Sequence, residues 1–538
     1  MTNSNSSNMV PPLVIQIGFA GARSLVDMAD FPDADPAAVE ASVREALGDL
    51  LRGLPGELKV QSDEVLLCGI SQIAIGADIA FTEACGELGI LQRIFLPQHL
   101  DAYFAAVGGR GPDFEEDQRR RAERLLGEEH IIETRLVSDS HVRHERFRDV
   151  NLEIIRESDV LICVVRKDQR GSSGGTHELL DLAGTLNRPT IILEVSIGED
   201  NEPMITRRDA DLNAFEVPRL PPELAGEAVA LEFSGDFPNG EDYCAGLQEL
   251  SSRHANTLSL RFKWAALLIV GGHVLATFLA LVALKLHSPV VPWLLGLELL
   301  FLGIGLWIHH NVHVTHSTPR CATFRVLAEL ASSVKAIGSF PVSQGHLFSL
   351  PFDEKFDSIL RTVSVLQMRD SFRGGTENWQ SHRDTYTKER LTNSEDRGQI
   401  SYHERTHARA EAWLSRTRII FYATSFLAIV ATTLKLLAMC DCLPLAGADG
   451  KVLPAVLGVL AVALPVIAVA ALSLATAFDL EAREGISSEM VGFLTDQVAR
   501  LKNATDAREY QRLLIETETR LLGETANWFA RRSYVGVS

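Results

Sequence analysis

The sequence predicts an α/β domain with a parallel sheet, followed by an all-α membrane domain with four transmembrane helices in two hairpins. In residues 13–250, short runs rich in Val, Ile and Leu alternate with helical stretches, which is typical of a parallel sheet covered on both faces. In the rest of the chain, four long apolar blocks are separated by charged segments. The 538 residues leave room for about three or four domains of ordinary size.

The predicted strands are residues 13–20, 64–71, 93–97, 159–165 and 189–195. Helical stretches between them include Pro36–Leu54 and Gly76–Leu88. In folds of this kind, ligands bind beyond the carboxyl ends of the strands. We therefore expect binding residues directly after each strand.

The apolar blocks are Trp264–Leu284, Pro289–Ile308, Ile419–Met439 and Val452–Phe478. Each reaches about 20 residues, the length that crosses a bilayer core, and short connections within each pair predict two hairpins. Basic residues gather outside the hairpin turns, so the positive-inside rule predicts that both termini and the central segment are cytoplasmic. These basic residues are Arg253, Arg261, Lys263, Arg320, Arg325, Arg405, Arg409, Arg416 and Arg418.

The expected domains are a disordered N-terminus (1–12), a cytosolic ligand-binding domain (13–250), a first hairpin with flanking helices (251–332), a cytosolic connecting segment (333–400), and a second hairpin with a cytosolic C-terminal helix (401–538).

The start of the chain has neither a basic region nor an apolar core, so no signal peptide is expected. The net charge of −19 argues against nucleic-acid binding, which needs Lys and Arg on the phosphates. The seven cysteines show no paired metal spacing and are expected to be reduced, although Cys440 and Cys442 form a C-x-C pair for which a metal or redox role is the alternative.

Three glycine-rich segments follow predicted strands. In Gly18–Ser24 the glycines permit a tight turn, and the planar guanidinium of Arg23 can donate two hydrogen bonds to a phosphate. The segment Gly69–Asp78 leads into a helix whose amino end can face an anion. In Gly171–Glu178 amides and hydroxyls suit a phosphate, and Glu178 can accept a hydrogen bond from a ribose hydroxyl. Each segment alone is also a common structural turn, but three together favour a ligand site. The P-loop motif does not occur, so P-loop hydrolysis is not indicated.

The first 200 residues resemble the SLOG superfamily, which unites the SMF/DprA DNA-processing proteins with the lonely-guy (LOG) nucleotide hydrolases. GFAGARS is similar to the family's G-x-x-G-x-R turn, GISQIAIGADIAFTEAC to its second glycine segment, and SSGGTHE to its G-G-x-G-T-x-x-E loop, while Asn151 takes the place of a pocket-lining helix residue. The resemblance implies a Rossmann-like fold that binds a nucleotide-derived messenger. The third loop lacks the hydrolases' leading Pro-Gly-Gly, which is typical of sensor domains.

These motifs predict a binding site for an ADP-ribose-like or cyclic nucleotide, with no redox or metal cofactor and no catalytic residue. Its candidate residues are Gly18, Gly21, Ala22, Arg23, Ser24, Gly69, Gly76, Asp78, Arg148, Asn151, Ser173, Gly174, Gly175, Thr176 and Glu178. The alternative function is a membrane-bound nucleotide hydrolase of the LOG type.

The rest of the chain resembles the SLATT group of membrane effector domains in bacterial anti-phage systems. The paired spans and the helical segments 321–332, 402–418 and 515–529 carry this resemblance. It implies an effector of abortive infection in the bacterial inner membrane, where the bound messenger triggers pore formation or membrane disruption. The expected partners are a nucleotide messenger, the lipid bilayer, a messenger-producing enzyme encoded elsewhere and further copies of the chain, since four spans are too few to enclose a wide pore.

Two further patterns lie in the membrane half. His273 and Glu298 are ionisable residues deep inside apolar blocks at similar depth, and they are interpreted either as a gating pair or as a structural pair that locks the hairpin. His403–His407 has the sequence H-E-x-x-H, which on a helix can bind zinc in a metalloprotease. The same segment also suits the surface of a charged juxtamembrane helix, so the protease is kept as a less favoured alternative.

Overall fold

The computed structural model describes residues 13–60, 65–104, 114–167, 175–198, 200–210, 212–218, 221, 223–224, 240–286, 289–315, 317–338, 340, 342, 352–372, 378–393, 398–439 and 452–534. The predicted disordered N-terminus (1–12) lies outside them. The chain divides into an α/β unit, made of residues 1–246 and 337–377, and a helical unit, made of residues 247–336 and 378–538. The predicted connecting segment (333–400) is thus shared between the two units.

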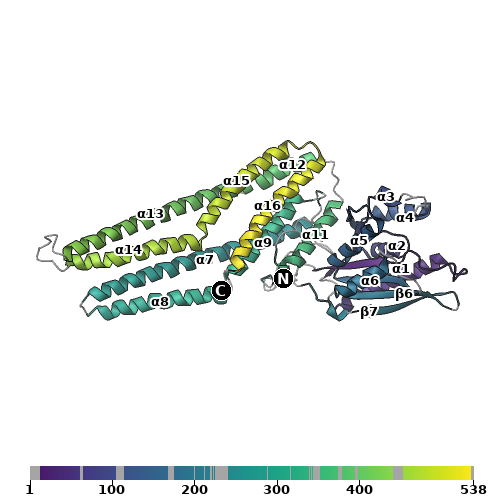
Figure 1. Cartoon of the computed structure of the whole chain (residues 1–538), viewed down its shortest axis with the longest axis horizontal. Coiled ribbons are helices and arrows are strands. Elements are labelled where there is room, and N and C mark those ends of the chain that lie inside the picture. The colour runs from purple at the N-terminus through teal and green to yellow at the C-terminus, as the bar shows by residue number, and fades with distance from the viewer. Residues whose placement is uncertain are drawn as a thin grey trace, which may run out of the picture. The chain divides into compact units, whose positions relative to one another are not determined.

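The described part of the α/β unit contains one sheet of seven strands in the order β4-β3-β2-β1-β5-β6-β7 (Figure 1). The strands are β1 (Leu13–Gly21), β2 (Val65–Ser71), β3 (Leu91–Leu96), β4 (Ile131–Leu136), β5 (Val160–Arg166), β6 (Thr190–Ile197) and β7 (Pro203–Ala210). Neighbouring strands are parallel except β6 and β7. The predicted parallel sheet is confirmed. The five predicted strands correspond to β1, β2, β3, β5 and β6, whereas β4 and β7 were not predicted.

Helices cover both faces of this sheet. They are α1 (Pro36–Glu57), α2 (Ala77–Leu88), α3 (Leu100–Phe104), α4 (Glu116–Leu126), α5 (Arg143–Glu157) and α6 (Thr176–Thr185), and a short 3-10 turn, η1 (Leu212–Ala214), follows β7. Ile17 and Phe19 of β1 belong to a core with α1 and α2, and Phe19 stacks on Phe81 with ring centroids 4.2 Å apart. Ala20, on the opposite side of the same strand, packs with Val150 of α5. The alternation of strand side chains thus gives β1 two buried faces.

A helix from much later in the chain completes the α/β unit. This helix is α11 (Asp357–Phe372), which follows the 3-10 turn η2 (Glu354–Phe356). The guanidinium of Arg361 in α11 donates hydrogen bonds to both carboxylate oxygens of Asp159. The same carboxylate accepts a 2.8 Å hydrogen bond from the backbone N–H of Gln16. Because Asp159 directly precedes β5, this ion pair holds α11 at the amino ends of the strands, opposite to the carboxyl ends.

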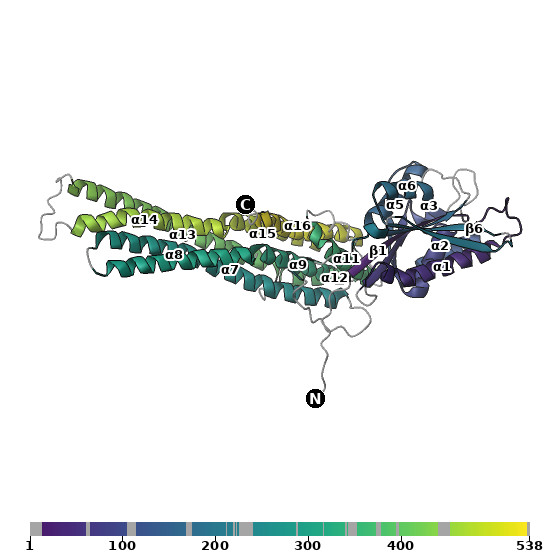
Figure 2. The same ribbon diagram turned by 90° about the horizontal axis from the view of Figure 1, so that it is seen from below.

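The described part of the helical unit consists of helices, most of them long. They are α7 (Gly240–Lys285, of which the first residues belong to the α/β unit), α8 (Val291–Val314), α9 (Ser317–Ile337), α12 (Trp379–Tyr386), the π-helical turn η4 (Thr387–Leu391), α13 (Gln399–Met439), α14 (Val452–Ala477), α15 (Leu480–Lys502) and α16 (Ala507–Tyr534). Among the described residues, four helices are long and apolar enough to cross a membrane: α7, α8, α13 and α14. They form two hairpins that lie side by side in both views (Figures 1 and 2). The carboxyl ends of α7 and α13 lie at the same end of the helical unit. The predicted four helices in two hairpins are confirmed.

The apolar side chains of these helices lie mostly on the outside. No more than 22% of the apolar window of any of the four is buried within the chain. Trp293 is 81% exposed, and Leu299, Phe426 and Val469 are also exposed. Contiguous apolar surface of this extent is unfavourable in water but matches the interior of a bilayer, where helices satisfy all their own backbone hydrogen bonds. The chain is therefore a membrane-associated protein.

A buried ion pair ties distant segments of the helical unit together. Arg390 of η4 donates to both carboxylate oxygens of Glu518 of α16, at 3.1 and 3.0 Å, and Glu518 is 0% exposed. The Tyr386 hydroxyl donates a 2.7 Å hydrogen bond to the same carboxylate. Arg390 also donates to Glu329 of α9 at 2.7 Å. Buried charges need this degree of compensation, because each charge has lost its contacts with water.

We predict that Glu518→Ala strongly destabilises the helical unit, because it leaves the buried Arg390 guanidinium without its main counter-ion. The expected cost is about 3–5 kcal/mol, seen as a fall of roughly 5–10 °C in the Tm of the protein in detergent by circular dichroism. The matched control is Glu489→Ala, whose partner Arg520 lies on the same helix as Glu518. That pair is 65% and 50% exposed and should contribute no more than about 1 kcal/mol. Equal Tm shifts for the two variants would contradict the assigned role of the buried pair.

Candidate functional site

A cavity of about 260 Å³ lies at the carboxyl ends of β1 and β2. Its remaining walls come from the amino-terminal parts of α2, α5 and α6. Strand β1 separates β2, β3 and β4 on one side from β5, β6 and β7 on the other, so the cavity lies where the strand order reverses. Open α/β sheets bind their ligands at this switch point. The lining residues are Ala20, Gly21, Ala22, Arg23, Gln72, Ala74, Asp78, Arg143, Phe147, Asn151, Gly175, Thr176 and His177.

Two glycines let the turn after β1 lie directly against the start of α2. A Cβ atom on Gly21 would be 2.2 Å from the Cβ of Ala77, and a Cβ on Gly76 would be 2.4 Å from the carbonyl oxygen of Arg23. Gly76 also has a φ of +85°, which favours glycine. The contact is closed by a 3.2 Å hydrogen bond from the Ala77 N–H to the Ala22 carbonyl. The first two glycine segments therefore form one continuous wall of the cavity.

The other two glycines of these segments have a packing role. A Cβ on Gly18 would be 2.8 Å from the side chain of Ser158, and one on Gly69 would be 3.1 Å from the ring of Phe81. Both glycines make room for core side chains, and neither lines the cavity.

Asp78 brings a titratable group to the floor of the cavity. It lies in the first turn of α2, is 5% exposed, and accepts a 3.3 Å hydrogen bond from the backbone N–H of Ala74. Burial raises the pKa of Asp78 to about 7, while Arg23 and the backbone N–H groups of Ala74 and Gly21 oppose this shift. The carboxyl therefore changes its charge close to neutral pH.

Two arginines give the cavity positive charge. Arg23 follows β1, Arg143 is the first residue of α5, and their guanidinium carbons lie 5.1 and 5.9 Å from the ring centroid of Phe147. Gly175 and Thr176 bring the amino end of α6 to the cavity, and α2 begins beside it. Helix amino ends and arginines both favour anions, so the cavity suits a phosphate group.

Buried polar groups provide a second kind of contact. Gln72 donates a 3.3 Å hydrogen bond from Nε2 to Oδ1 of Asn151, and both side chains are buried. The Oε1 of Gln72 and the Nε2 of His177 have no hydrogen-bond partner among the described residues. Since buried polar atoms are normally paired, these atoms can accept or donate hydrogen bonds to hydroxyl or amine groups of a ligand.

The structure gathers part of the predicted set around the cavity. Its lining includes Gly21, Ala22, Arg23, Asp78, Asn151, Gly175 and Thr176. Ser24, Gly76, Arg148 and Glu178 are not among the lining residues: the Ser24 hydroxyl donates to the Val26 carbonyl at 2.6 Å, and Arg148 lies 3.5 Å from Glu178. Ser173 and Gly174 lie outside the described residues.

Sequence reasoning missed Gln72, Arg143, Phe147 and His177, which also line the cavity. The sequence contains a usable signal for three of them. Arg143 and Phe147 precede Asn151 by eight and four residues on α5, so the three side chains share one face of that helix. Gln72 directly follows β2, where a binding residue is expected.

The candidate membrane residues occupy separate places. His273 Nδ1 hydrogen-bonds the Ile269 carbonyl one turn earlier at 2.8 Å. Its ring lies against α8, where a Cβ on Gly305 would be 3.2 Å from the ring. Glu298 is about two helical turns from Gly305. Among the described residues, no hydrogen bond or ion pair joins His273 to Glu298.

The two histidines of the H-E-x-x-H segment have different surroundings. His403 is 3% exposed and lines a cavity of the helical unit, whereas His407 lies 3.7 Å from Glu484 of α15 and 3.9 Å from Glu411. No group of three or more His, Cys, Asp or Glu side chains among the described residues is arranged to hold a metal ion. Cys440 and Cys442 lie outside those residues.

No protein-family model, no curated protein and no solved structure matches this chain.

We predict that Gly76→Ala disrupts the turn that builds the cavity. Its Cβ would meet two carbonyl oxygens, at 2.4 and 2.7 Å, on a backbone with positive φ. The expected cost is on the order of 3 kcal/mol or more, measured as a loss of thermal stability of the purified protein. The matched control is Gly89→Ala at the other end of α2. Gly89 also has positive φ, but a Cβ there meets nothing within 4 Å, so only about 1–2 kcal/mol is expected. A smaller loss for Gly76→Ala than for Gly89→Ala would show that the close approach is not required.

Proposed function

We propose that this protein is a membrane effector whose α/β unit binds a nucleotide-derived messenger and whose helical unit responds by forming a pore or disrupting the membrane. The observation that carries the proposal is the placement of Arg23 and Arg143 beside the amino ends of α2 and α6, around one cavity at the switch point of the sheet. Four apolar helices in the same chain supply a membrane element for such a sensor to control.

The chemistry of the cavity supports a nucleotide as the ligand. The arginines and helix amino ends suit phosphates, whereas Gln72, Asn151 and His177 suit the hydroxyl and amine groups of a ribose or base. The volume of about 260 Å³ is slightly below the range of about 300–1,000 Å³ for small-molecule pockets. A ligand of modest size, or one half of an ADP-ribose-like molecule, is therefore the best match.

The helix α7 offers a route from ligand to membrane. It begins in the α/β unit, where the Gly240 N–H donates a 2.7 Å hydrogen bond to Asp370 of α11, and it continues as one helix to Lys285. A ligand shifts such a system only when it binds the active state more tightly than the resting state. The messenger is thus proposed to favour a conformation of the α/β unit that moves the start of α7.

The biological role proposed here is abortive infection in bacteria, in line with the SLOG and SLATT resemblances. A separate enzyme would make the messenger during infection, and several copies of the chain would assemble to enclose a pore. The short connections within each hairpin and the basic residues outside them support an inner-membrane location with cytoplasmic termini.

A second candidate function is hydrolysis of a nucleotide in the same cavity, as in LOG-type enzymes. Asp78 favours it, because a buried carboxyl with a pKa of about 7 suits acid–base catalysis at neutral pH. The two functions are separated by incubating the protein with a nucleotide and following the products by chromatography. Turnover that is lost in Asp78→Asn supports the enzyme.

We predict that Arg23→Ala weakens ligand binding at least about 10-fold, because one charge-assisted hydrogen bond contributes about 1.5–3 kcal/mol. The test uses the full-length protein in vesicles filled with a fluorescent dye, with ADP-ribose or cyclic nucleotides added on the side of the α/β unit. Dye release should need the nucleotide, and should fall in Arg23→Ala and Arg143→Ala.

The control for this test is Arg52→Ala, an exposed arginine of α1 paired only with Asp49 among the described residues. It should leave both binding and dye release unchanged. Release that survives in Arg23→Ala and Arg143→Ala but is lost in Glu404→Ala would overturn the proposal and favour the H-E-x-x-H segment.

We predict that ligand affinity falls as the pH rises through about 7. The pKa of Asp78 is raised, so its carboxyl is neutral below pH 7 and negative above it, where it repels a phosphate. Phosphodiester ligands, such as cyclic nucleotides, suit the measurement because their own charge is constant over this range. Titration calorimetry at pH 6 and pH 8 should show weaker binding at pH 8 for the wild type and a flat profile for Asp78→Asn. A flat wild-type profile would place the phosphate away from Asp78.

A further inference from the structure

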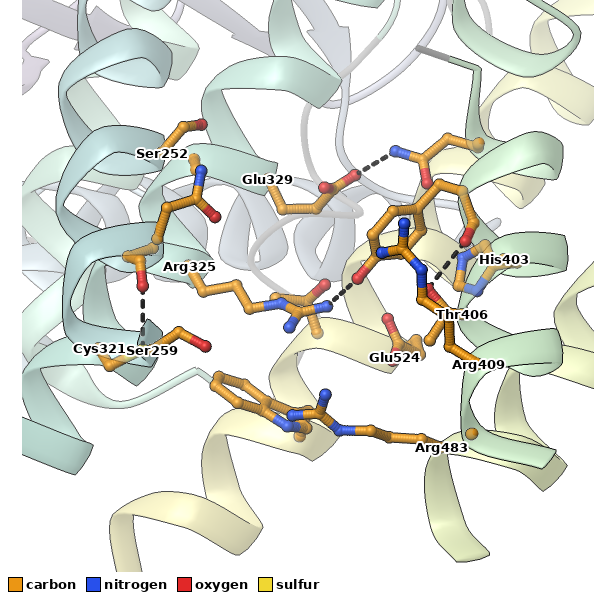
Figure 3. Close-up of a pocket in the computed structure, with 18 of the residues that line it drawn as sticks. Ser252, Ser259, Cys321, Arg325, Glu329, His403, Thr406, Arg409, Arg483 and Glu524 are labelled. Carbon is orange, nitrogen blue, oxygen red and sulfur yellow. Dashed lines mark hydrogen bonds between the residues drawn. The ribbon is translucent and has the colours of Figure 1, made fainter. Parts of the chain in front are cut away.

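A second cavity, of about 720 Å³, lies in the helical unit among helix segments mostly outside the apolar blocks. Figure 3 shows Arg325 of α9, Arg409 of α13 and Arg483 of α15 directed toward this cavity. Lys263 of α7 lines it as well. Four cations from four helices, which are distant in sequence, thus meet in one place.

Three of these four cations form no ion pair within the described part of the chain. The side chains of Lys263, Arg409 and Arg483 make no hydrogen bond or ion pair with the residues that the structure describes. Burial lowers the pKa of Arg483, and the nearby charge of Arg325 lowers it further. Glu524 lines the same cavity, and burial raises the pKa of its carboxyl although Arg325 opposes this shift, so its negative charge is itself disfavoured. The cavity is therefore prepared for an anion from outside the chain.

A buried histidine adds an unfilled hydrogen-bonding position. His403 lines the cavity and is 3% exposed, and its Nδ1 has no partner among the described residues. Ser252, Asn256 and Ser259 of α7 line the same cavity with hydroxyl and amide groups. Polar groups of this kind suit an anion that also carries hydroxyl groups.

An apolar groove continues from the cationic cavity along the transmembrane helices. It has a volume of about 490 Å³ and is lined by α7, α13 and α14, mainly through aliphatic side chains such as Val274, Ile467 and Ala470. Leu267, Trp413, Phe478 and Leu480 line both the cavity and the groove, so the two adjoin.

The junction lies at the level where the apolar part of the helices begins. Lys263 directly precedes the first apolar block, and Phe478 directly follows the last residue of α14. Trp413, with the Arg416 guanidinium carbon 5.7 Å from its ring centroid, is placed as aromatic residues are at a membrane–water interface. The cationic cavity thus corresponds to the headgroup level and the groove to the acyl-chain level.

We propose that the cavity and the groove together form one binding site for a phospholipid with an anionic headgroup. Its phosphate binds Lys263, Arg409 and Arg483, its headgroup hydroxyls reach His403 and the α7 hydroxyls, and an acyl chain fills the groove. A free anion would satisfy the cations but leave the groove empty. A neutral lipid would fill the groove but leave the cations uncompensated. Only an anionic phospholipid meets both requirements.

The site would join the two hairpins. The groove is formed by α7 of the first hairpin with α13 and α14 of the second, and the cations come from the helices that extend or follow these spans. A bound lipid therefore acts as a bridge between the hairpins. This inference does not depend on the proposed nucleotide function, since it concerns other residues.

The test is native mass spectrometry of the full-length protein released from detergent micelles that contain phosphatidylglycerol or phosphatidylcholine. The wild type should retain phosphatidylglycerol in preference to phosphatidylcholine. The double variant Lys263→Ala/Arg483→Ala should retain it roughly 10-fold less or weaker still, since two phosphate contacts are lost. The control is Arg253→Ala on the same helix α7, which is 69% exposed and paired with Glu249. It should retain the lipid as the wild type does.

A second variant tests the groove without touching the cations. Ala470→Leu fills the groove and should also reduce phosphatidylglycerol retention, whereas Val469→Leu, on the exposed side of the same helix, should not. Glycerol phosphate is the competitor that separates a lipid site from a free-anion site, and it should displace little phosphatidylglycerol. Equal retention of the two lipids, full displacement by glycerol phosphate, or no effect of both the double variant and Ala470→Leu would each overturn the proposal.

Discussion

The ion pair between Arg390 and Glu518 is the interaction on which the helical unit depends, because it holds together segments that no local sequence pattern connects. Glu518 of α16 is fully buried, and its carboxylate is met by Arg390 of η4 and by the Tyr386 hydroxyl, while Arg390 reaches Glu329 of α9. The cost of burying these charges is offset only when all partners are in place. The α/β unit uses the same device on a smaller scale, where Arg361 of α11 binds Asp159 at the amino end of β5.

The two cavities differ from these ion pairs in how their charges are compensated. In the ion pairs above, each buried charge has its counter-charge within the chain, so nothing further is required of the surroundings. At the carboxyl ends of β1 and β2, Arg23 faces a carboxyl, Asp78, that burial keeps partly protonated. Beside the transmembrane helices, Lys263, Arg409 and Arg483 make no ion pair with the described residues. Incomplete compensation of charge costs stability, and a bound anion removes that cost. These charges are the basis of the two proposed anion sites, and the adjoining apolar groove distinguishes the second site from the first.

The sequence was sufficient where one strong local pattern determined the structure. The apolar runs identified β1, β2, β3, β5 and β6 and the four long apolar helices, because buried parallel strands and bilayer-crossing helices both require nearly continuous apolar sequence. β4 and β7 were missed because both lie at the edges of the sheet and carry charged residues such as Glu133 and Arg207. The glycine spacing located the turn of Arg23 and the start of α2. It did not locate the cationic cavity, since Lys263, Arg325 and Arg409 were each explained by the charge rule for membrane topology.

The helix α7 begins in the α/β unit and continues to the proposed lipid site, and this continuity has a thermodynamic consequence. Its first residue is bound by Asp370 of α11 in the α/β unit, and further along it supplies Lys263 to the cationic cavity and Val274 to the groove. If a messenger alters the position of α7, it alters the geometry of the lipid site as well. Linkage requires the reverse effect: a lipid that binds one position of α7 more tightly changes the affinity for the messenger by the same factor. The lipid composition of the membrane would then set the messenger concentration at which the proposed effector responds, and α7 would couple the two sites in both directions.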